Sequence, residues 1–235
     1  MAASPKTKAR NLLNRFPFTD LSVAVSRRGT RRENFLRSFV DSDPALSYQA
    51  TRNAAALIYC VEQPLFSTPI LGLDAIKEVI RATAPERNHA INLDATEQLF
   101  NLVRPQRYKA YEHDEQRLRI GHNQVVHIGL KFYVVDGQRL VFQYPQPRAQ
   151  AVFDENVAIV MMSIMHHAYA TGDYAEAEIE MADISAEEKG EPRAPRIRHL
   201  ARGDLLSREE LTDHIVEVYS VLQVLAARKF GDGES

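Results

Sequence analysis

The feature that most constrains the fold is an apolar segment in the second half of the chain. Asp154 and Glu155 precede the sequence VAIVMMSIM (residues 157–165), in which only Ser163 is polar. The two acidic residues are placed to start a helix, and a helix that is apolar on nearly every face has to be buried. The segment is about half as long as the roughly 20 residues that a membrane helix requires. We therefore expect a soluble protein built around one central helix, with no membrane partner.

The chain changes character at Pro105. Before it, apolar residues recur at the spacing of amphipathic helices. Thr30 and Glu33 have the spacing of a capping box, so we expect a helix to start at Thr30 and its arginines to lie at that start. Helices are predicted for residues 30–40, 43–59, 73–80 and 94–103.

After Pro105 the sequence favours strands. Three segments are rich in β-branched and aromatic residues, and Asp136-Gly137 between the last two is typical of a hairpin turn. We expect these segments, residues 117–121, 124–135 and 139–144, to form a three-strand meander.

Two further strands and a helix are predicted beyond the buried helix. Residues 177–184 alternate apolar residues with acidic ones, which predicts a fourth strand with one wet acidic face, and residues 195–201 are expected to add a short edge strand. Ser207 and Glu210 form a second capping box at the start of a long amphipathic helix.

The predicted fold class is α+β. A helical N-terminal half is followed by a small mixed or antiparallel sheet, made of the meander, the buried helix and a further strand, and then by the long C-terminal helix. Within the 235 residues we distinguish a mainly helical region with a basic N-terminus, residues 1–103, from an α+β region, residues 104–235. Because the length suits one domain with elaborations, we expect a single compact domain.

Charge is distributed unevenly, although the net charge is only −2. Residues 1–40 hold nine basic residues against two acidic ones, whereas residues 173–191 hold eight acidic residues against one lysine. Residues 192–202 then contain four arginines and no acidic residue. The net charge argues against a dedicated high-affinity nucleic-acid-binding domain, and the opposite blocks can neutralise each other within the fold. The basic residues are otherwise free to bind an outside anion.

The candidate anion-binding residues come from three basic segments. The middle one, RPQRYKAY (residues 104–111), combines cations with tyrosines, a composition that suits nucleic-acid phosphates and bases, although acidic residues follow it at once. The candidates for binding nucleic acid or an acidic protein surface are Arg27, Arg28, Arg31, Arg32, Arg107, Lys109, Arg196 and Arg198.

No metal, cofactor or catalytic residue is predicted. The chain has one cysteine, Cys60, in an apolar run, so neither a disulfide nor a thiolate site is expected. The eight histidines are poorly spaced for a metal: His122 and His127 would face opposite ways on a strand, and adjacent His166 and His167 diverge on a helix. Nucleotide-binding glycine loops, serine hydrolase elbows and zinc protease motifs do not occur.

Two parts of the sequence nevertheless resemble known classes of enzyme. The order helix, three strands, helix, strand over residues 94–184 is similar to the core of the PD-(D/E)xK nuclease superfamily, with Asp136 and Glu97 at positions that suit its acids. The third strand offers Gln143, Tyr144 and Pro145 where that superfamily has its acid-x-Lys, so the resemblance implies a degenerate, non-cleaving relative. Separately, Arg208 and His214 are spaced similarly to the Arg and His of the HEPN ribonucleases.

The function favoured by these patterns is that of a non-enzymatic cytoplasmic binding or regulatory protein. Its basic N-terminal surface would meet nucleic acid or an acidic protein partner. A phosphodiester-cleaving enzyme, or its degenerate relative, is the first alternative. A subunit of a larger assembly is the second, and residues 207–230 would then suit a homodimer contact because their apolar face is wider than a narrow seam.

Overall fold

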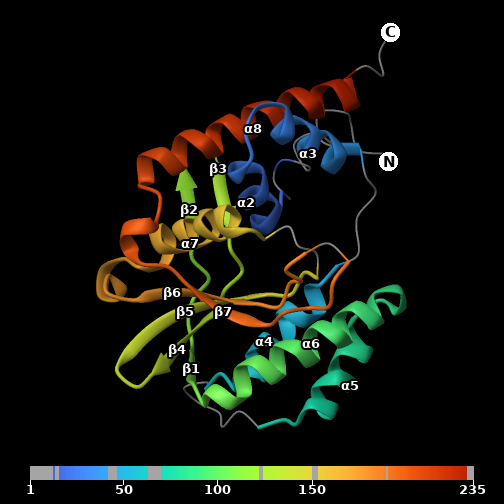
Figure 1. Ribbon diagram of the computed structural model, residues 1–235, viewed down its shortest axis with the longest axis vertical. Helices are drawn as coiled ribbons and strands as arrows, with labels where there is room; N and C mark the ends of the chain where they lie inside the picture. The colour runs from blue at the N-terminus through green and yellow to red at the C-terminus, as the bar shows by residue number, and fades with distance from the viewer. Residues whose placement is uncertain are drawn as a thin grey trace.

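A mixed five-stranded sheet lies between two groups of helices (Figure 1). The computed structural model describes residue 13 and residues 16–41, 47–62, 70–121, 124–149, 153–188 and 190–231. Within these residues it has the predicted α+β class, with a helical N-terminal half, strands in the middle and a long C-terminal helix. One cluster of buried apolar side chains includes residues from both regions of the chain, such as Leu36, Leu99 and Met161.

The strand order of the main sheet is β1-β4-β5-β6-β7. The antiparallel meander consists of β1 (Lys109–Glu112), β4 (Phe132–Asp136) and β5 (Arg139–Gln146). The chain then passes through α7 (Glu155–Tyr169) and returns as β6 (Glu178–Asp183), which is parallel to β5. Strand β7 (Arg196–His199) pairs antiparallel with β6 and forms the predicted edge strand.

The central helix α7 confirms the prediction from its apolar sequence. The Asp154 carboxylate accepts a hydrogen bond of 2.9 Å from the Val157 N–H, which caps the helix. Met161, Met162, Ile164 and Met165 are fully buried. On the same side of the sheet, above α7 in Figure 1, lie α2 (Phe18–Ser26), α3 (Gly29–Asp41) and α8 (Arg208–Gly231).

The opposite face of the sheet is covered by α4 (Gln49–Tyr59) and α6 (His89–Val103), with α5 (Leu73–Thr83) packed against both (Figure 1). A buried set of hydrogen bonds joins α4 to α6. The Asn92 side chain accepts from the Thr51 N–H at 3.0 Å and donates to the Ser47 carbonyl at 2.8 Å. The N-terminal helices therefore divide between the two faces of the sheet. Short 3-10 turns occupy Glu86–Asn88, Arg104–Gln106, Gly172–Tyr174 and Arg202–Asp204.

The meander is built from different strands than the sequence predicted. Segment 124–135 is interrupted at Gly129, whose φ of +80° suits glycine and ends the extended run. Its first part, β3 (Gln124–His127), pairs only with β2 (Arg117–Ile120) in a separate two-stranded ribbon. This ribbon packs on α7 and α8. The first strand of the meander is instead β1, in a segment that we had interpreted as a basic surface.

Two other expectations are corrected by the structure. Helix α3 begins at Gly29, so Thr30 lies inside the helix, and Glu33 accepts from Arg37 at 2.7 Å instead of capping the helix start. The acidic face of β6 is only partly wet, since Glu178 is 34% exposed whereas Glu180, which pairs with Arg139, is 5% exposed. The predicted helix start at Asp43-Pro44 lies outside the described residues.

The C-terminal helix follows its prediction closely. The Ser207 hydroxyl accepts from the Glu210 N–H at 3.2 Å, and the Glu210 carboxylate accepts from the Ser207 N–H at 2.9 Å, which is the predicted capping box. Leu211, Ile215, Val218 and Leu222 are fully buried along one face. In the part of the chain that the structure describes, no helix combines the length and apolarity needed to cross a membrane.

Candidate interaction surfaces

Four of the predicted anion-binding residues cluster where α2 meets α3. Arg27 is the C-cap residue that follows α2, and its guanidinium lies 4.6 Å from the centre of the Phe35 ring. Arg31 is exposed on the first turn of α3, where a cation opposes the helix dipole. Arg28 precedes α3 and is also exposed. Arg32 differs from the other three because it is only 2% exposed.

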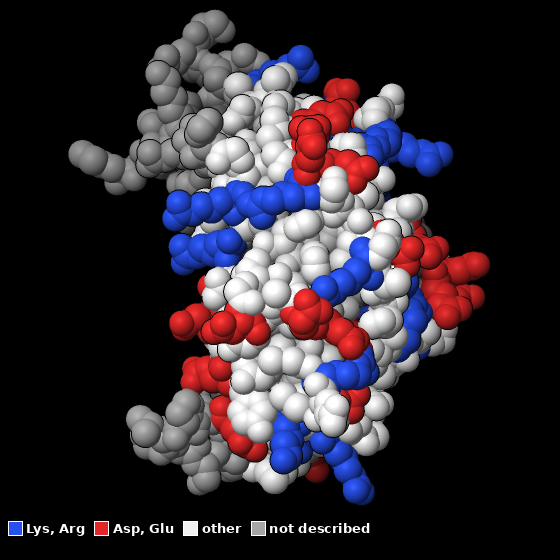
Figure 2. Space-filling model, turned by 90° about the vertical axis from the view of Figure 1, so that its left-hand side faces the viewer, with Lys and Arg blue, Asp and Glu red and all other residues white. Residues whose placement is uncertain are grey.

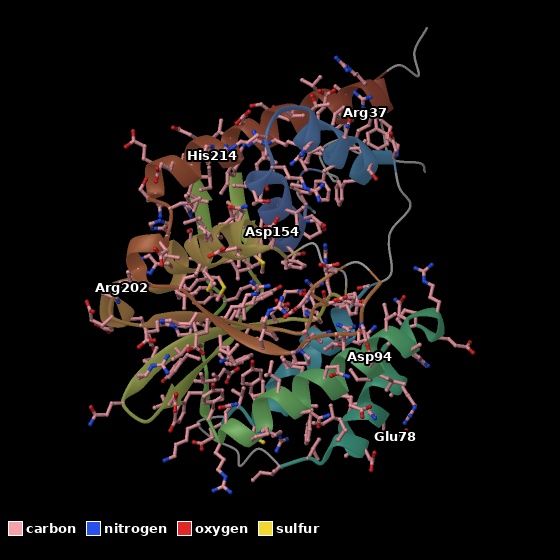
Figure 3. All side chains as sticks on the ribbon, in the orientation of Figure 1. Arg37, Glu78, Asp94, Asp154, Arg202 and His214 are labelled. Atoms are coloured by element: carbon pink, nitrogen blue, oxygen red, sulfur yellow. The ribbon has the colours of Figure 1, made fainter. Side chains whose placement is uncertain are left out.

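Arg28 and Arg32 face the C-terminal helix. The Arg28 guanidinium lies 2.7 Å from both ring nitrogens of His214, the residue labelled on α8 in Figure 3. Partial burial, followed by the charges of Arg28 and Arg32, lowers the pKa of His214, which favours the neutral ring that can accept from Arg28. The Arg32 guanidinium pairs with Glu217, and this contact lowers the pKa of the Glu217 carboxyl. Arg32 is therefore an internal ion-pair partner.

Arg107 and Lys109 lie elsewhere. Arg107 follows the end of α6, which covers the face of the sheet opposite α3 (Figure 1), and Lys109 is the first residue of β1, an edge strand of the sheet. Both are exposed, and Arg107 adopts a left-handed conformation with φ of +54° that turns the chain from α6 into β1. The three basic segments thus do not share one face. On the face shown in Figure 2, Lys and Arg side chains are interspersed with Asp and Glu.

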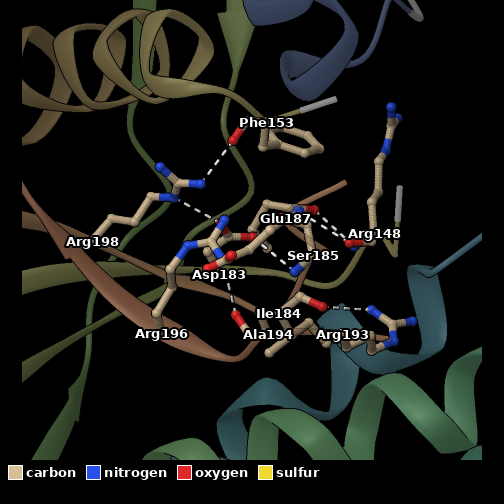
Figure 4. A network of polar contacts seen from close by, with 11 residues as sticks. Arg148, Phe153, Asp183, Ile184, Ser185, Glu187, Arg193, Ala194, Arg196 and Arg198 are labelled. Atoms are coloured by element: carbon tan, nitrogen blue, oxygen red, sulfur yellow. Dashed lines mark hydrogen bonds and ion pairs between the residues drawn. The ribbon is translucent and has the colours of Figure 1, made fainter. Parts of the chain in front are cut away.

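Arg196 and Arg198 converge on a buried carboxylate at the end of β6 (Figure 4). Arg198 Nε and Arg196 Nη2 lie 2.7 and 3.0 Å from Asp183 Oδ2. The second oxygen, Asp183 Oδ1, accepts from the Ser185 N–H at 2.9 Å. Arg198 also donates to the Phe153 carbonyl at 2.8 Å, which ties β7 to the start of α7. The two arginines line a cavity of about 330 Å³, whose wall also contains Asp154, Glu155 and Glu187.

The acidic block of residues 173–191 accounts for several neighbouring arginines. Arg196 also approaches Glu187 at 3.6 Å, and Arg202 lies 3.4 Å from Glu176. Arg193 instead pairs at 2.5 Å with Asp94 of α6, which Figure 3 labels. The arginines of residues 193–202 are therefore paired within the protein. This is the alternative in which opposite charges neutralise each other within the fold, and these arginines are not free to bind an outside anion.

Sequence reasoning missed a polar cluster on the α4 and α6 side of the sheet. Glu178 and Glu180 share one face of β6, and the β6–β7 pairing places His199 directly opposite Glu180. Oxygens of the two carboxylates and a nitrogen of His199 lie within 4.8 Å of one another, a spacing that suits a metal ion. His199 is distant in sequence from the two acids, so only the strand register would have revealed the cluster.

Arg139 occupies the centre of this cluster. Its Nη2 lies 2.6 Å from Glu178 and 2.7 Å from Glu180, and Nη1 lies 3.1 Å from Asp136. These bonds lower the pKa of Glu178 and raise that of Arg139. Gln143 donates to Glu180 at 2.8 Å and accepts from the Tyr59 hydroxyl at 2.6 Å. The carboxylates thus hold a guanidinium.

The residues compared with nuclease acids are also engaged in pairs. Asp136 contacts Arg139, and Glu97 lies 2.6 Å from Lys77 of α5. Gln143 stands at the strand position where the nuclease core carries an acid, and its amide bridges Tyr59 and Glu180. Of the HEPN-like pair, His214 contacts Arg28, whereas Arg208 donates at 3.1 Å to the Arg119 carbonyl. Each residue of these constellations therefore has a structural contact.

Comparison with known proteins identifies the family. A family model described as "SocB: Sliding clamp-binding bacterial toxin SocB" matches residues 19–230, from the first turn of α2 to the end of α8. The chain belongs to the SocB family. It is similar to the DNA replication inhibitor toxin SocB of Caulobacter vibrioides (strain NA1000 / CB15N), with 25% identity over 232 residues, which cover 94% of this chain and 97% of that protein. No solved structure matches the chain.

Membership of the SocB family confirms the prediction of a binding protein at that general level, since the family is described by the partner that it binds. That partner is a protein, the sliding clamp. The match extends over α2, α3 and α8, so the arginines that face α8 lie inside the region that defines the family.

Proposed function

We propose that this chain binds a sliding clamp and thereby inhibits DNA replication. The observation that carries the proposal is the family match over residues 19–230, supported by a relative described as a DNA replication inhibitor toxin that aligns along nearly its whole length. Inhibition by binding requires no catalytic residue, which agrees with our preference for a non-enzymatic, regulatory protein. The clamp acts on DNA in the cytoplasm, which would be the site of action.

We further propose that the N-terminal basic surface contributes to this partner contact. We define it as Arg27, Arg28 and Arg31, because these residues are exposed or partly exposed at the junction of α2 and α3. Arg31 forms no ion pair with any described residue, so its charge is available to an acidic patch on a protein. Nucleic acid is the alternative partner for the same residues, and Arg107 and Lys109 would form a second, separate contact.

The test combines purified protein with the sliding clamp of the same organism and measures affinity by biolayer interferometry. The double variant Arg28→Glu with Arg31→Glu should weaken clamp binding by about tenfold or more, because it reverses two charges at the contact. The matched control, Arg87→Glu with Arg228→Glu, makes the same change in net charge at exposed positions elsewhere and should leave the affinity within about threefold.

A replication assay completes this test. Clamp-dependent DNA synthesis in a purified system should fall as the wild-type protein is added, and extra clamp should restore it. Absence of clamp binding together with unimpaired synthesis would refute the proposed function. Normal clamp binding by the Arg28→Glu, Arg31→Glu variant would refute only the role of the basic surface.

A further inference from the structure

We infer that the outer face of the β2–β3 ribbon is a second interaction surface, which binds duplex DNA. This surface, the ribbon face, consists of the outward side chains Arg117 and Arg119 on β2 and Val125 and His127 on β3. None of the candidate anion-binding residues predicted from the sequence belongs to it. It also does not depend on the proposed clamp contact, because clamp binding and DNA binding can be measured separately.

Strand alternation fixes which side chains face outward. Leu118 is 2% exposed, Ile120 1% and Val126 3%, and they hold the inner face of the ribbon against the body of the protein. The residues between them are exposed. Arg117 lies opposite His127, and Arg119 lies opposite Val125, so the four outward side chains form two cross-strand pairs. The ribbon face is thus set on a rigid, packed element.

The charge of the ribbon face is not neutralised within the described part of the protein. Arg117 and Arg119 form no ion pair with any described residue, whereas Arg32, Arg139, Arg196 and Arg198 all have carboxylate partners. Arg208, at the start of α8, donates to the Arg119 carbonyl and adds a third cation beside them. Glu115 lies 3.7 Å from His127, and it is the acidic group that we find paired at the base of the ribbon.

Shape and composition favour duplex DNA among polyanions. The major groove of B-DNA, about 12 Å wide, admits a two-stranded ribbon whose strands lie about 4.8 Å apart. The corresponding groove of duplex RNA is too narrow for this entry. Single-stranded nucleic acid is bound largely by stacking on aromatic rings, and the described ribbon face carries no Phe, Tyr or Trp. The exposed Val125, 40% accessible, is suited to apolar contact with a thymine methyl group.

The inference is tested by fluorescence anisotropy with a labelled 20-base-pair duplex in about 50 mM salt, where non-specific contacts are strong. If the protein makes three phosphate contacts, a plot of the logarithm of the association constant against the logarithm of the salt concentration should have a slope of about −2.7. The variant Arg117→Glu with Arg119→Glu should lose at least about tenfold in affinity and reduce that slope to about −1. Arg117→Lys with Arg119→Lys should retain most of the binding, because phosphates accept either cation.

The control variant is again Arg87→Glu with Arg228→Glu, which should bind the duplex within about threefold of wild type. Circular dichroism and thermal unfolding establish that each variant is folded. Three results would overturn the inference: absence of salt-sensitive duplex binding by wild type, equal losses in the ribbon and control variants, or tighter binding to single strands or duplex RNA. A ribbon variant that loses clamp binding but keeps DNA binding would also overturn it and assign the ribbon face to the clamp.

Discussion

Arg32 is buried against α8 and pairs with the carboxylate of Glu217. The sequence offered Arg32 as a free cation at a helix start, but the fold uses it to join the N-terminal helices to the C-terminal one. Arg32 Nε also donates to the carbonyls of Ala24 and Arg27 at 3.1 and 2.9 Å, which closes the end of α2. One buried side chain thus connects three helices.

Replacing Arg32 with Met should lower the free energy of unfolding by about 1 to 3 kcal/mol. The variant removes the Arg32 donor from the Arg27 carbonyl and leaves the Ala24 carbonyl with the Arg27 N–H, and an unsatisfied buried group costs about 1 to 3 kcal/mol. Urea denaturation followed by circular dichroism measures the change. Glu217→Gln should also destabilise, because it removes the counter-charge of the buried Arg32 guanidinium, but by less than Arg32→Met, because Glu217 is 58% exposed and Arg32 keeps its carbonyl contacts. A stable Arg32→Met variant would contradict this structural role.

Asp183→Asn should be one of the most destabilising polar substitutions in the chain. The carboxylate is fully buried and balances Arg196 and Arg198, so its loss leaves two guanidinium groups close together without a counter-charge. Breaking a buried pair in this way typically costs about 3 to 5 kcal/mol. Urea denaturation of Asp183→Asn beside Glu187→Gln checks the expectation.

Glu187 is the matched control because it is 71% exposed and lies 3.6 Å from Arg196. Its substitution should change stability by less than about 0.5 kcal/mol. Equal effects of the two substitutions would mean that the Asp183 network contributes little to the fold.

Local signals in the sequence were sufficient for the fold class and for the starts of α7 and α8, whereas α2 was not predicted. Asp154 before an apolar run and Ser207 with Glu210 predicted the starts of α7 and α8 because caps act within a few residues. Gly129 interrupts the run of residues 124–135, and this break was missed because an isolated glycine in an apolar run gives no unique signal.

The ion pairs could not be predicted from the sequence, because they join residues that are distant along the chain. Asp183 meets Arg196 and Arg198 only through the register of β6 on β7, and Arg32 meets Glu217 across 185 positions of chain. The sequence indicated only that blocks of opposite charge can neutralise each other, and the structure pairs acids of residues 173–191 with Arg196, Arg198 and Arg202. The ribbon face was missed because Arg117 and Arg119 belong to no dense basic segment.

Self-association through residues 207–230 stays a prediction, and the structure locates the side chains that would mediate it. Val216 and Val224 are 41% and 50% exposed on α8, while Leu211, Ile215, Val218 and Leu222 are fully buried. Light scattering coupled to size-exclusion chromatography should show a dimer for wild type and a monomer for Val216→Glu with Val224→Glu. A wild-type monomer at all accessible concentrations would contradict the homodimer.

The stability of the protein should decrease as the pH falls from 8 to 5.5, and His214 should contribute to this decrease. Burial beside Arg28 and Arg32 lowers its pKa below the ordinary value of about 6.5. Between the lowered and the ordinary pKa, the unfolded chain binds more protons than the folded one, so acid favours unfolding. His166, whose pKa burial and the neighbouring His167 also lower, acts in the same direction.

Urea midpoints measured across this pH range test the role of His214. His214→Gln removes the titrating group but keeps an acceptor for Arg28, so its midpoint should vary less with pH than that of wild type. Arg32 lowers the pKa of the Glu217 carboxyl, so this group acts in the same direction as His214, but its contribution to stability is lost only as the pH falls from about 4.3 through the lowered pKa. The two effects therefore occupy separate pH windows. An identical pH dependence for wild type and His214→Gln would show that Arg28 does not hold this ring in its neutral form.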